Sequence, residues 1–180
     1  MVGILERIKN FRNRESIHIF LCGLRGSDWE GICSEIEPTT LYHYEELHIR
    51  GKRFSIWDFS GDAKVKCIPA YVARSVNVAA VIFVVSATEH ADSSCRELLD
   101  RIRRMDMDDA FSSSLFVILL NKISSGSQYN GLETFLKRQL SDPHRFIFVV
   151  VNVLHGLKDA AWLQLLDAIY AHHKKTVASA

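Results

Sequence analysis

The stretch IHIFLCGLRGSDWEGI, residues 17–32, decides the fold of this 180-residue chain. Residues 17–22 are an apolar run with the length of one buried strand, and Gly23 begins a tight loop after it. The segment over residues 29–36 has room for only about two helical turns, because Pro38 disfavours a helical residue before it. A strand, a glycine-containing loop and a short helix are therefore expected in this order.

This layout matches a phosphate-binding loop, G-x-x-x-x-G-K-[ST], whose glycines, lysine and hydroxyl surround phosphates and Mg²⁺. Gly23 stands at the first glycine, but Asp28, Trp29 and Glu30 replace the second glycine, the lysine and the hydroxyl. Two like charges about 4 Å apart repel by roughly 4 kcal/mol at an effective dielectric near 20, so Asp28 and Glu30 oppose a bound phosphate. These residues alone leave open the alternative of a strand-to-helix turn that never bound a nucleotide.

Composition places the chain among globular single-domain proteins. It is 48% apolar and 24% charged, and its formal net charge of +1 gives no electrostatic case for binding nucleic acid. No apolar run reaches the roughly eighteen residues that a membrane span needs, and no signal peptide precedes the domain. We expect a cytoplasmic protein that meets membranes only peripherally.

The cysteines and histidines do not form a metal-binding pattern. Cys22, Cys33, Cys67 and Cys95 are widely spaced and lack C-x-x-C pairing. Reduced thiols packed as small apolar residues are the expected state, and no metal ligand is predicted.

Residues 1–14 have the pattern of an amphipathic helix. Met1, Ile4, Leu5, Ile8 and Phe11 fall on one face, opposite a basic polar face. Such a helix can dock on the domain or on a partner protein, or lie in a membrane interface. The second residue is not glycine, so the N-myristoylation signal is absent and any membrane contact should be weak.

The rest of the chain alternates buried strands with amphipathic helices. Residues 41–49 and 53–57 read as a hairpin turning at Gly51. Further strands are expected over residues 79–85, 115–120 and 146–151, and helices over 65–74, 93–105, 132–140 and 157–172. This order predicts an α/β fold with a mostly parallel sheet, one antiparallel hairpin strand and helices on both faces, over residues 15–174, followed by a frayed tail over 175–180.

Several polar or glycine residues follow the ends of predicted strands. Gly23, Gly61, Asn121 and Asn152 all lie at such positions. In open α/β sheets the ligand lies outside the carboxyl ends of the strands. We expect these residues to line one shared edge.

Three short motifs lie in a fixed order along the chain: Pro38-Thr39, Trp57-Asp58-x-x-Gly61 and Asn121-Lys122. Together with the N-terminal amphipathic helix, they resemble the Arf/Arl family of small GTPases over essentially the whole chain. The resemblance implies a Ras-like P-loop fold with a pocket for GTP or GDP and Mg²⁺. The corresponding, degenerate pocket here consists of Gly23, Asp28, Trp29, Glu30, Thr39, Gly61, Asn121, Lys122 and Ser124.

The departures from the family pattern fall on the nucleotide contacts. Ser124 replaces the aspartate that reads guanine, and a neutral hydroxyl cannot replace a bidentate carboxylate. Asp62 occupies the position of the glutamine that orients the attacking water. The segment before Pro38 is about eight residues shorter than the family pattern, so Thr39 should not reach over the phosphates. No catalytic residue and no bound cofactor are expected.

The resemblance also implies a surface for effector-type proteins on the hairpin and the following helix. Tyr42, Trp57 and Val72 match the family's contact positions, and Tyr44 and Tyr71 lie nearby. Strand alternation predicts that Trp57 points outward, because Phe54 and Ile56 should take the inward face.

A charged stretch late in the chain has a simpler interpretation. Arg101, Arg103 and Arg104 alternate with aspartates near the end of the predicted helix over residues 93–105. This pattern is typical of a solvated, salt-linked helix end.

The sequence as a whole predicts an Arf/Arl-like pseudo-GTPase, a protein-binding module in membrane traffic or ciliary transport. The alternative is a working GTP-binding switch of the same family in vesicle-mediated transport, with divergent nucleotide contacts. A third alternative is a sheet domain that binds an unrelated ligand at the same edge, although paired carboxylates or a Ser/His/Asp arrangement for a new enzyme are not apparent.

Overall fold

The computed structural model describes residues 16–23, 39–86, 92–121, 130–140, 145–152, 155 and 158–179. The predicted N-terminal helix over residues 1–14 lies outside this part of the chain. So do five positions of the predicted nucleotide pocket: Asp28, Trp29, Glu30, Lys122 and Ser124.

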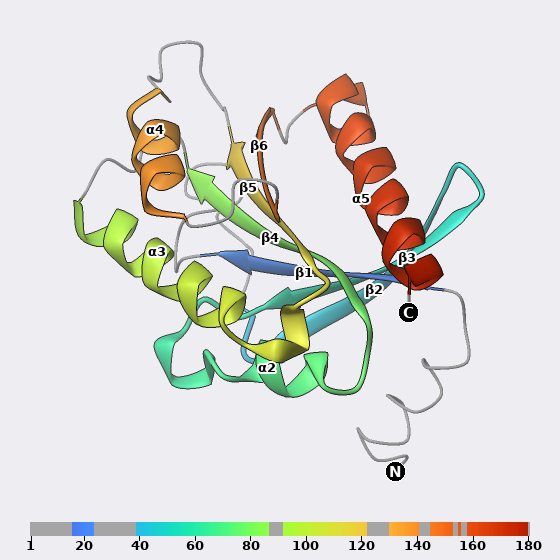
Figure 1. Ribbon diagram of the computed structural model, residues 1–180, viewed down its shortest axis with the longest axis horizontal. Coiled ribbons are helices and arrows are strands. Elements are labelled where there is room, and N and C mark those ends of the chain that lie inside the picture. Colours follow the sequence, from blue (N-terminus) through green and yellow to red (C-terminus); the bar gives the residue numbers. More distant parts are fainter. Residues whose placement is uncertain are drawn as a thin grey trace.

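A six-stranded sheet forms the centre of the molecule, in the order β2-β3-β1-β4-β5-β6 (Figure 1). The strands are β1 (Ile17–Gly23), β2 (Tyr42–Ile49), β3 (Lys52–Phe59), β4 (Val78–Ser86), β5 (Leu115–Asn121) and β6 (Phe146–Val151). All neighbouring strands are parallel except β2, which runs antiparallel to β3. The predicted mostly parallel sheet with one antiparallel hairpin strand is confirmed.

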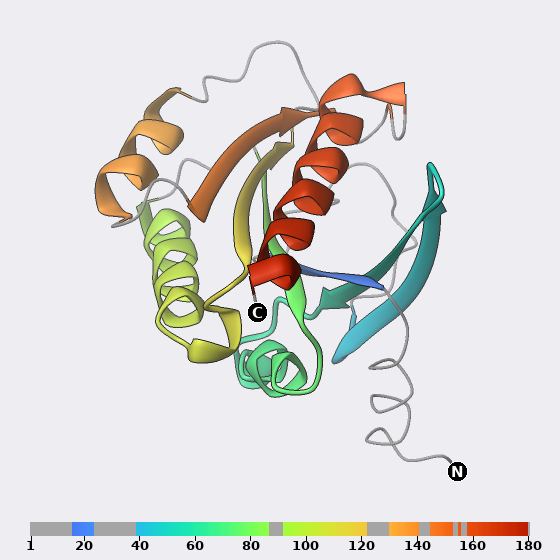
Figure 2. The same cartoon turned by 45° about the vertical axis from the view of Figure 1, so that its right-hand side comes forward.

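Helices cover both faces of the sheet, as predicted. They are α2 (Ile68–Ala73), α3 (Asp92–Asp106), α4 (Asn130–Gln139) and α5 (Ala160–Ser179), with short 3₁₀ turns η1 (Ala63–Val65) and η2 (Asp109–Phe111). One apolar core joins the sheet to α2, α3 and α4, and a second joins the other face to α5 (Figure 2). The uninterrupted apolar runs of β4 and β5 follow from this, because both faces of these strands are buried.

The hairpin between β2 and β3 turns through two residues with positive φ. Arg50 has φ 51° and Gly51 has φ 73°, the backbone pattern of a type I′ turn. Gly51 adopts this conformation without the steric cost that a side chain brings. The tight turn places the basic residues that flank it at one end of the sheet.

Two predicted helix boundaries differ from the structure. The helix expected over residues 65–74 is divided into η1 and α2, and Pro69 lies at the start of α2, where its missing N–H costs no hydrogen bond. The final helix was expected to end at His172 but continues to Ser179, so most of the expected frayed tail is helical. Near this end the Thr176 hydroxyl donates to the carbonyl oxygens of His172 and His173, in addition to the helical backbone bonds.

Candidate functional site

The carboxyl ends of the parallel strands bring the predicted rim residues to one edge. Gly23 ends β1, Gly61 follows β3, Asn121 ends β5 and Asn152 follows β6. The strand registers pair Cys22 with Phe59 and Asn121 with Val151, which places all four rim residues at the same edge.

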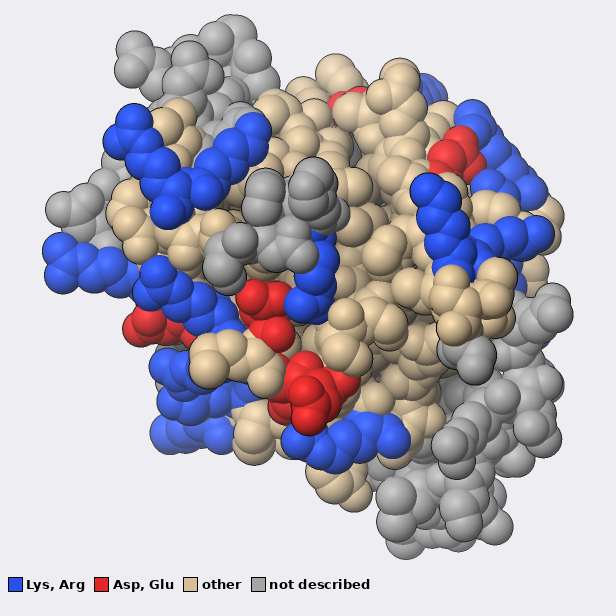
Figure 3. All heavy atoms as spheres, in the orientation of Figure 1, with Lys and Arg blue, Asp and Glu red and all other residues tan. Residues whose placement is uncertain are grey.

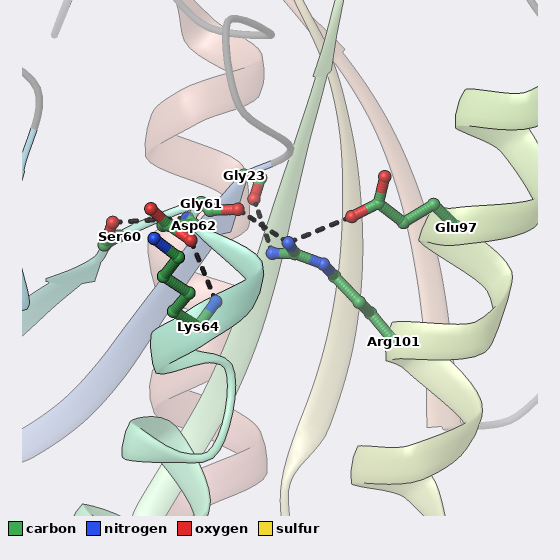
Figure 4. Close-up of polar contacts among 7 residues, drawn as sticks. All are labelled: Gly23, Ser60, Gly61, Asp62, Lys64, Glu97 and Arg101. Atoms are coloured by element: carbon green, nitrogen blue, oxygen red, sulfur yellow. Dashed lines mark hydrogen bonds and ion pairs between the residues drawn. The ribbon is translucent and has the colours of Figure 1, made fainter.

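Arg101 of α3 reaches this edge and joins the end of β1 to the loop after β3 (Figure 4). Its guanidinium donates to the carbonyl oxygen of Gly23 at 3.0 Å and to that of Gly61 at 2.7 Å. Glu97, one helical turn earlier, accepts a third bond at 3.1 Å. The Arg101 side chain is only 15% exposed. The prediction that Arg101 belongs to a solvated helix end is therefore wrong.

The Arg101 contacts make a mechanical link between three elements. Hydrogen bonds from a charged donor contribute roughly 1.5–3 kcal/mol each when they are shielded from water. Here they connect α3 to the last residue of β1 and to the loop after β3. Sequence analysis missed this role, because Gly23 and Gly61 lie 78 and 40 positions from Arg101.

Thr39 and Asp58 form a second polar pair at the end of the hairpin. The Thr39 hydroxyl donates to the Asp58 carboxylate at 3.4 Å. Burial raises the pKa of Asp58, and the bond from Thr39 opposes that rise. A carboxylate and a hydroxyl are oxygen donors of the kind that Mg²⁺ accepts.

Asp62 stabilises its own turn. Its carboxylate accepts a hydrogen bond from the backbone N–H of Lys64 at 2.8 Å and caps η1 (Figure 4). Its own N–H donates to the Ser60 hydroxyl at 3.2 Å. The side chain at the switch-glutamine position thus has a structural partner in the adjacent backbone.

The last rim position is shaped by the start of α5. The Asn152 N–H donates to the Asp159 carboxylate at 3.0 Å, and Ala161 N–H donates to the same carboxylate at 2.9 Å. These backbone bonds hold the pKa of Asp159 below its usual value. Asn121, the rim residue at the end of β5, is buried in the sheet and is only 2% exposed.

Trp57 lies inside the molecule, which corrects the prediction that it points outward. It is 2% exposed, and its indole N–H donates to His18 Nδ1 at 3.2 Å. The alternation itself is correct, since Phe54 packs in the core under α5 and Trp57 in the core under α2 and α3. The prediction failed because both faces of β3 are covered.

The remaining predicted contact residues differ in exposure. Val72 is 3% exposed and belongs to the core, so it is not a surface anchor. Tyr42 and Tyr44 are half-buried, with ring centroids 5.5 and 4.7 Å from that of Trp57. Burial raises the pKa of Tyr44 to about 12. Tyr71 is 56% exposed and is the predicted anchor that a partner can reach most fully.

The exposure of Leu41 was not predicted. This residue lies just before β2 and is 47% exposed. The adjacent Ser60 N–H donates to its carbonyl at 3.0 Å, which fixes Leu41 beside the end of β3. Its apolar character made it an expected strand residue and gave no sign of exposure.

Within the described ranges, no cluster of three or more His, Cys, Asp or Glu side chains is placed to hold a metal ion. None of the helices in the described part of the chain is long and apolar enough to cross a membrane.

The comparisons with known proteins agree with this geometry. The model of the ADP-ribosylation factor family matches residues 29–160. No curated protein sequence matches. Among solved structures, the chain is similar to the Arl6 BBS3 small GTPase from Trypanosoma brucei with bound nucleotide analogue GppNp. The TM-score is 0.68 at 19% identity, with 87% of this chain and 99% of that chain covered.

The structural similarity confirms the predicted Ras-like small GTPase fold, and the family match spans more than half of the chain. It includes the hairpin, the residues around Asp58 and Gly61, and the strand that ends at Asn121. The chain belongs to the ADP-ribosylation factor family.

Proposed function

We propose that this protein is a pseudo-GTPase of the ADP-ribosylation factor family that works as a protein-binding module. Its binding and hydrolysis of guanine nucleotides are lost or severely weakened. The observation that carries the proposal is the Arg101 link, which joins Gly23 at the end of β1 to Gly61 through their carbonyl oxygens. The guanidinium of Arg101 is thus already engaged by groups of the protein.

The residues of the edge do not fit a nucleoside triphosphate. Phosphates require N–H donors and cations. Asp58 presents a carboxylate there, and the Arg101 guanidinium donates to carbonyl oxygens and to Glu97. The sequence adds Trp29 and Glu30 at the positions of the lysine and the hydroxyl.

The protein-binding surface in this proposal consists of Leu41, Tyr42, Tyr44 and Tyr71. Leu41 and Tyr71 are exposed, and the two other tyrosines rest on the buried Trp57. Exposed aromatic residues make effective anchors, because they bury a large area at a small entropic cost. Effector-type proteins are the partner class that we assign to this surface.

The cellular setting is proposed from family membership alone. We place the protein in the cytoplasm, in membrane traffic or ciliary transport. Weak contact of the N-terminal segment with membranes is included in this proposal.

The binding surface is tested with a Tyr71→Ala variant in a pull-down from cell extract. Tyr71→Ala should lose the principal partner, while a Phe135→Ala variant should keep it. Phe135 is 37% exposed on α4 and is a matched aromatic control away from α2. Retention of every partner by Tyr71→Ala would remove this surface from the proposal.

The second candidate function is a GTP-binding switch with divergent contacts. The Thr39–Asp58 pair favours it, because two oxygen donors suited to Mg²⁺ lie together near Gly61. This function requires GTP and GDP to change the solvent protection of residues 1–14. Identical hydrogen exchange of that segment with either nucleotide and without nucleotide would exclude it.

A further inference from the structure

A cavity of about 1150 Å³ lies at the opposite end of the sheet from the rim residues. Its walls come from the start of β1, the β2–β3 hairpin, the loop before β4 and the last turns of α5. Because β1, β3 and β4 run parallel, their amino ends meet here, away from Gly23 and Gly61. The cavity is large enough for a small-molecule ligand.

The charged side chains in the described lining of this cavity are all basic. They are Lys52, Arg53, Arg74 and Lys174; three histidines, His18, His48 and His173, also line it, and none of the described lining residues is acidic. Figure 3 shows lysine and arginine side chains gathered near the end of α5 and the hairpin. The chain as a whole has a net charge of only +1, so this is a local concentration of positive charge.

Two buried polar atoms of the lining have no partner among the described residues. They are Nε of Arg53 and Nδ1 of His173. Buried polar groups are nearly always hydrogen-bonded, and an arginine is protonated at every physiological pH. Arg53 Nε–H is therefore a donor available to a bound anion.

Two of the four lysine and arginine side chains at the cavity have a carboxylate partner among the described residues. Asp167 accepts from Lys52 at 2.8 Å, and Asp108 lies 3.4 Å from Arg74, an exposed pair of the kind that contributes little. Arg53 and Lys174 form no ion pair within the described ranges, and Lys174 lies over the ring of Tyr170 at 5.4 Å. Glu46 lies close enough to His18 to influence it electrostatically, but it does not line the cavity.

We propose that this cavity binds a compact anion carrying several phosphate groups, of the inositol polyphosphate type. Arg53 of β3, Arg74 before β4 and Lys174 of α5 come from three separate elements, so they can contact different phosphates of one ligand. Arginine forks suit phosphate geometry, and hydrogen bonds assisted by charge are strong in a partly enclosed site. Anions with several phosphate groups occur both as soluble inositol polyphosphates and as the head groups of membrane lipids.

The proposal is tested on the full chain by calorimetric titration with inositol hexakisphosphate. Flotation with phosphatidylcholine vesicles, with and without phosphatidylinositol 4,5-bisphosphate, identifies a lipid source. Binding of inositol hexakisphosphate or of the phosphatidylinositol 4,5-bisphosphate vesicles, at moderate salt, supports the site. The probe that binds more tightly identifies whether the ligand is a soluble inositol polyphosphate or a lipid head group. Binding should weaken as salt rises, because charged contacts contribute most of the affinity.

Variants locate the bound anion. Arg74→Gln/Lys174→Gln should weaken binding by about tenfold or more, since a lost contact of about 1.4 kcal/mol corresponds to a tenfold change in affinity. The matched control, Arg104→Gln/Arg138→Gln, removes the same charge from exposed positions on α3 and α4 and should stay within about twofold. All four side chains are exposed, so both variants should fold.

Two results would overturn the proposal. One is no binding of either probe by the unaltered chain. The other is equal weakening by the cavity variant and by the α3–α4 control, which would mean attraction by total charge alone. The proposal is independent of the nucleotide pocket, because the two sites lie at opposite ends of the strands.

Discussion

Trp57 and His18 show how one side-chain contact links the neighbouring strands β1 and β3 inside the core. The indole N–H of Trp57 donates to His18 Nδ1, and both side chains are almost fully buried. Tyr42 and Tyr44 then rest on the indole ring from the edge strand β2. Trp57 is therefore buried, and Tyr42 and Tyr44 cover it as half-buried residues of the edge strand.

Replacement of Trp57 should cost stability. Trp57→Ala is expected to lower the free energy of unfolding by about 3–5 kcal/mol, the range for removal of a large buried aromatic side chain. Tyr71→Ala, at an exposed position, should change it by about 0.5 kcal/mol or less. Urea unfolding followed by circular dichroism measures both. A loss below about 1 kcal/mol for Trp57→Ala would contradict the buried position.

His18 should make stability depend on pH. Burial, with a smaller effect of His173, lowers the pKa of His18 from 6.5 to about 4. Between these values the unfolded chain binds a proton that the folded chain does not, so the free energy of unfolding falls as pH falls from about 6.5 towards 4. The full shift corresponds to about 3 kcal/mol. The measurement is urea unfolding at pH 7 and at pH 4.5.

A His18→Gln variant is the control for this pH dependence. Glutamine cannot take up a proton, yet its amide oxygen can accept the bond from Trp57. The variant should lose less stability than the unaltered chain over the same pH interval. Parallel curves for the two proteins would show that His18 does not titrate differently on folding.

At the scale of secondary-structure elements, α3 acts as a brace for the loop edge. Arg101, in the second half of this helix, joins the end of β1 to the loop after β3. Loops at such edges usually have low local stability. The bonds from Arg101 tie Gly23 and Gly61 to α3.

Loss of the Arg101 brace should loosen the loop after β3. In Arg101→Met, amides of residues 60–65 should exchange with solvent about tenfold faster or more, which corresponds to loss of one charged hydrogen bond. Arg103→Met, whose exposed guanidinium bonds to Gln139, should leave this segment unchanged. Hydrogen exchange with mass spectrometry measures the difference. Equal exchange in the two variants would show that Arg101 does not hold the loop.

The sequence predicted elements better than it predicted contacts. Apolar runs identified β4, β5 and β6 to within a residue or two. For β4 and β5 the reason is that strands buried on both faces leave no room for polar residues. The burial of Trp57 was missed because alternation separates the faces of a strand without saying which faces are covered. The role of Arg101 was missed because charge spacing along a helix carries no information about distant loops.

At the scale of the whole molecule, the two ends of the sheet differ in the side chains that the structure describes there. The described part of the rim contains Asp58, Asp62 and backbone carbonyls bonded to Arg101. The described lining of the cavity at the amino end contains no acidic residue. The chain has the small GTPase fold, and the anion site that we propose lies at the end of the sheet opposite to the rim.

The most direct test of the central claim is the nucleotide content of the purified protein. The chain is purified from cells, denatured, and its supernatant is separated by ion exchange, with a functional family member as the positive control. Our account predicts far less than one mole of GDP or GTP per mole of protein, and no heat when Mg²⁺ and GTP are titrated into the native chain. Stoichiometric guanine nucleotide in the extract would contradict it and would assign the protein to the working switches of its family.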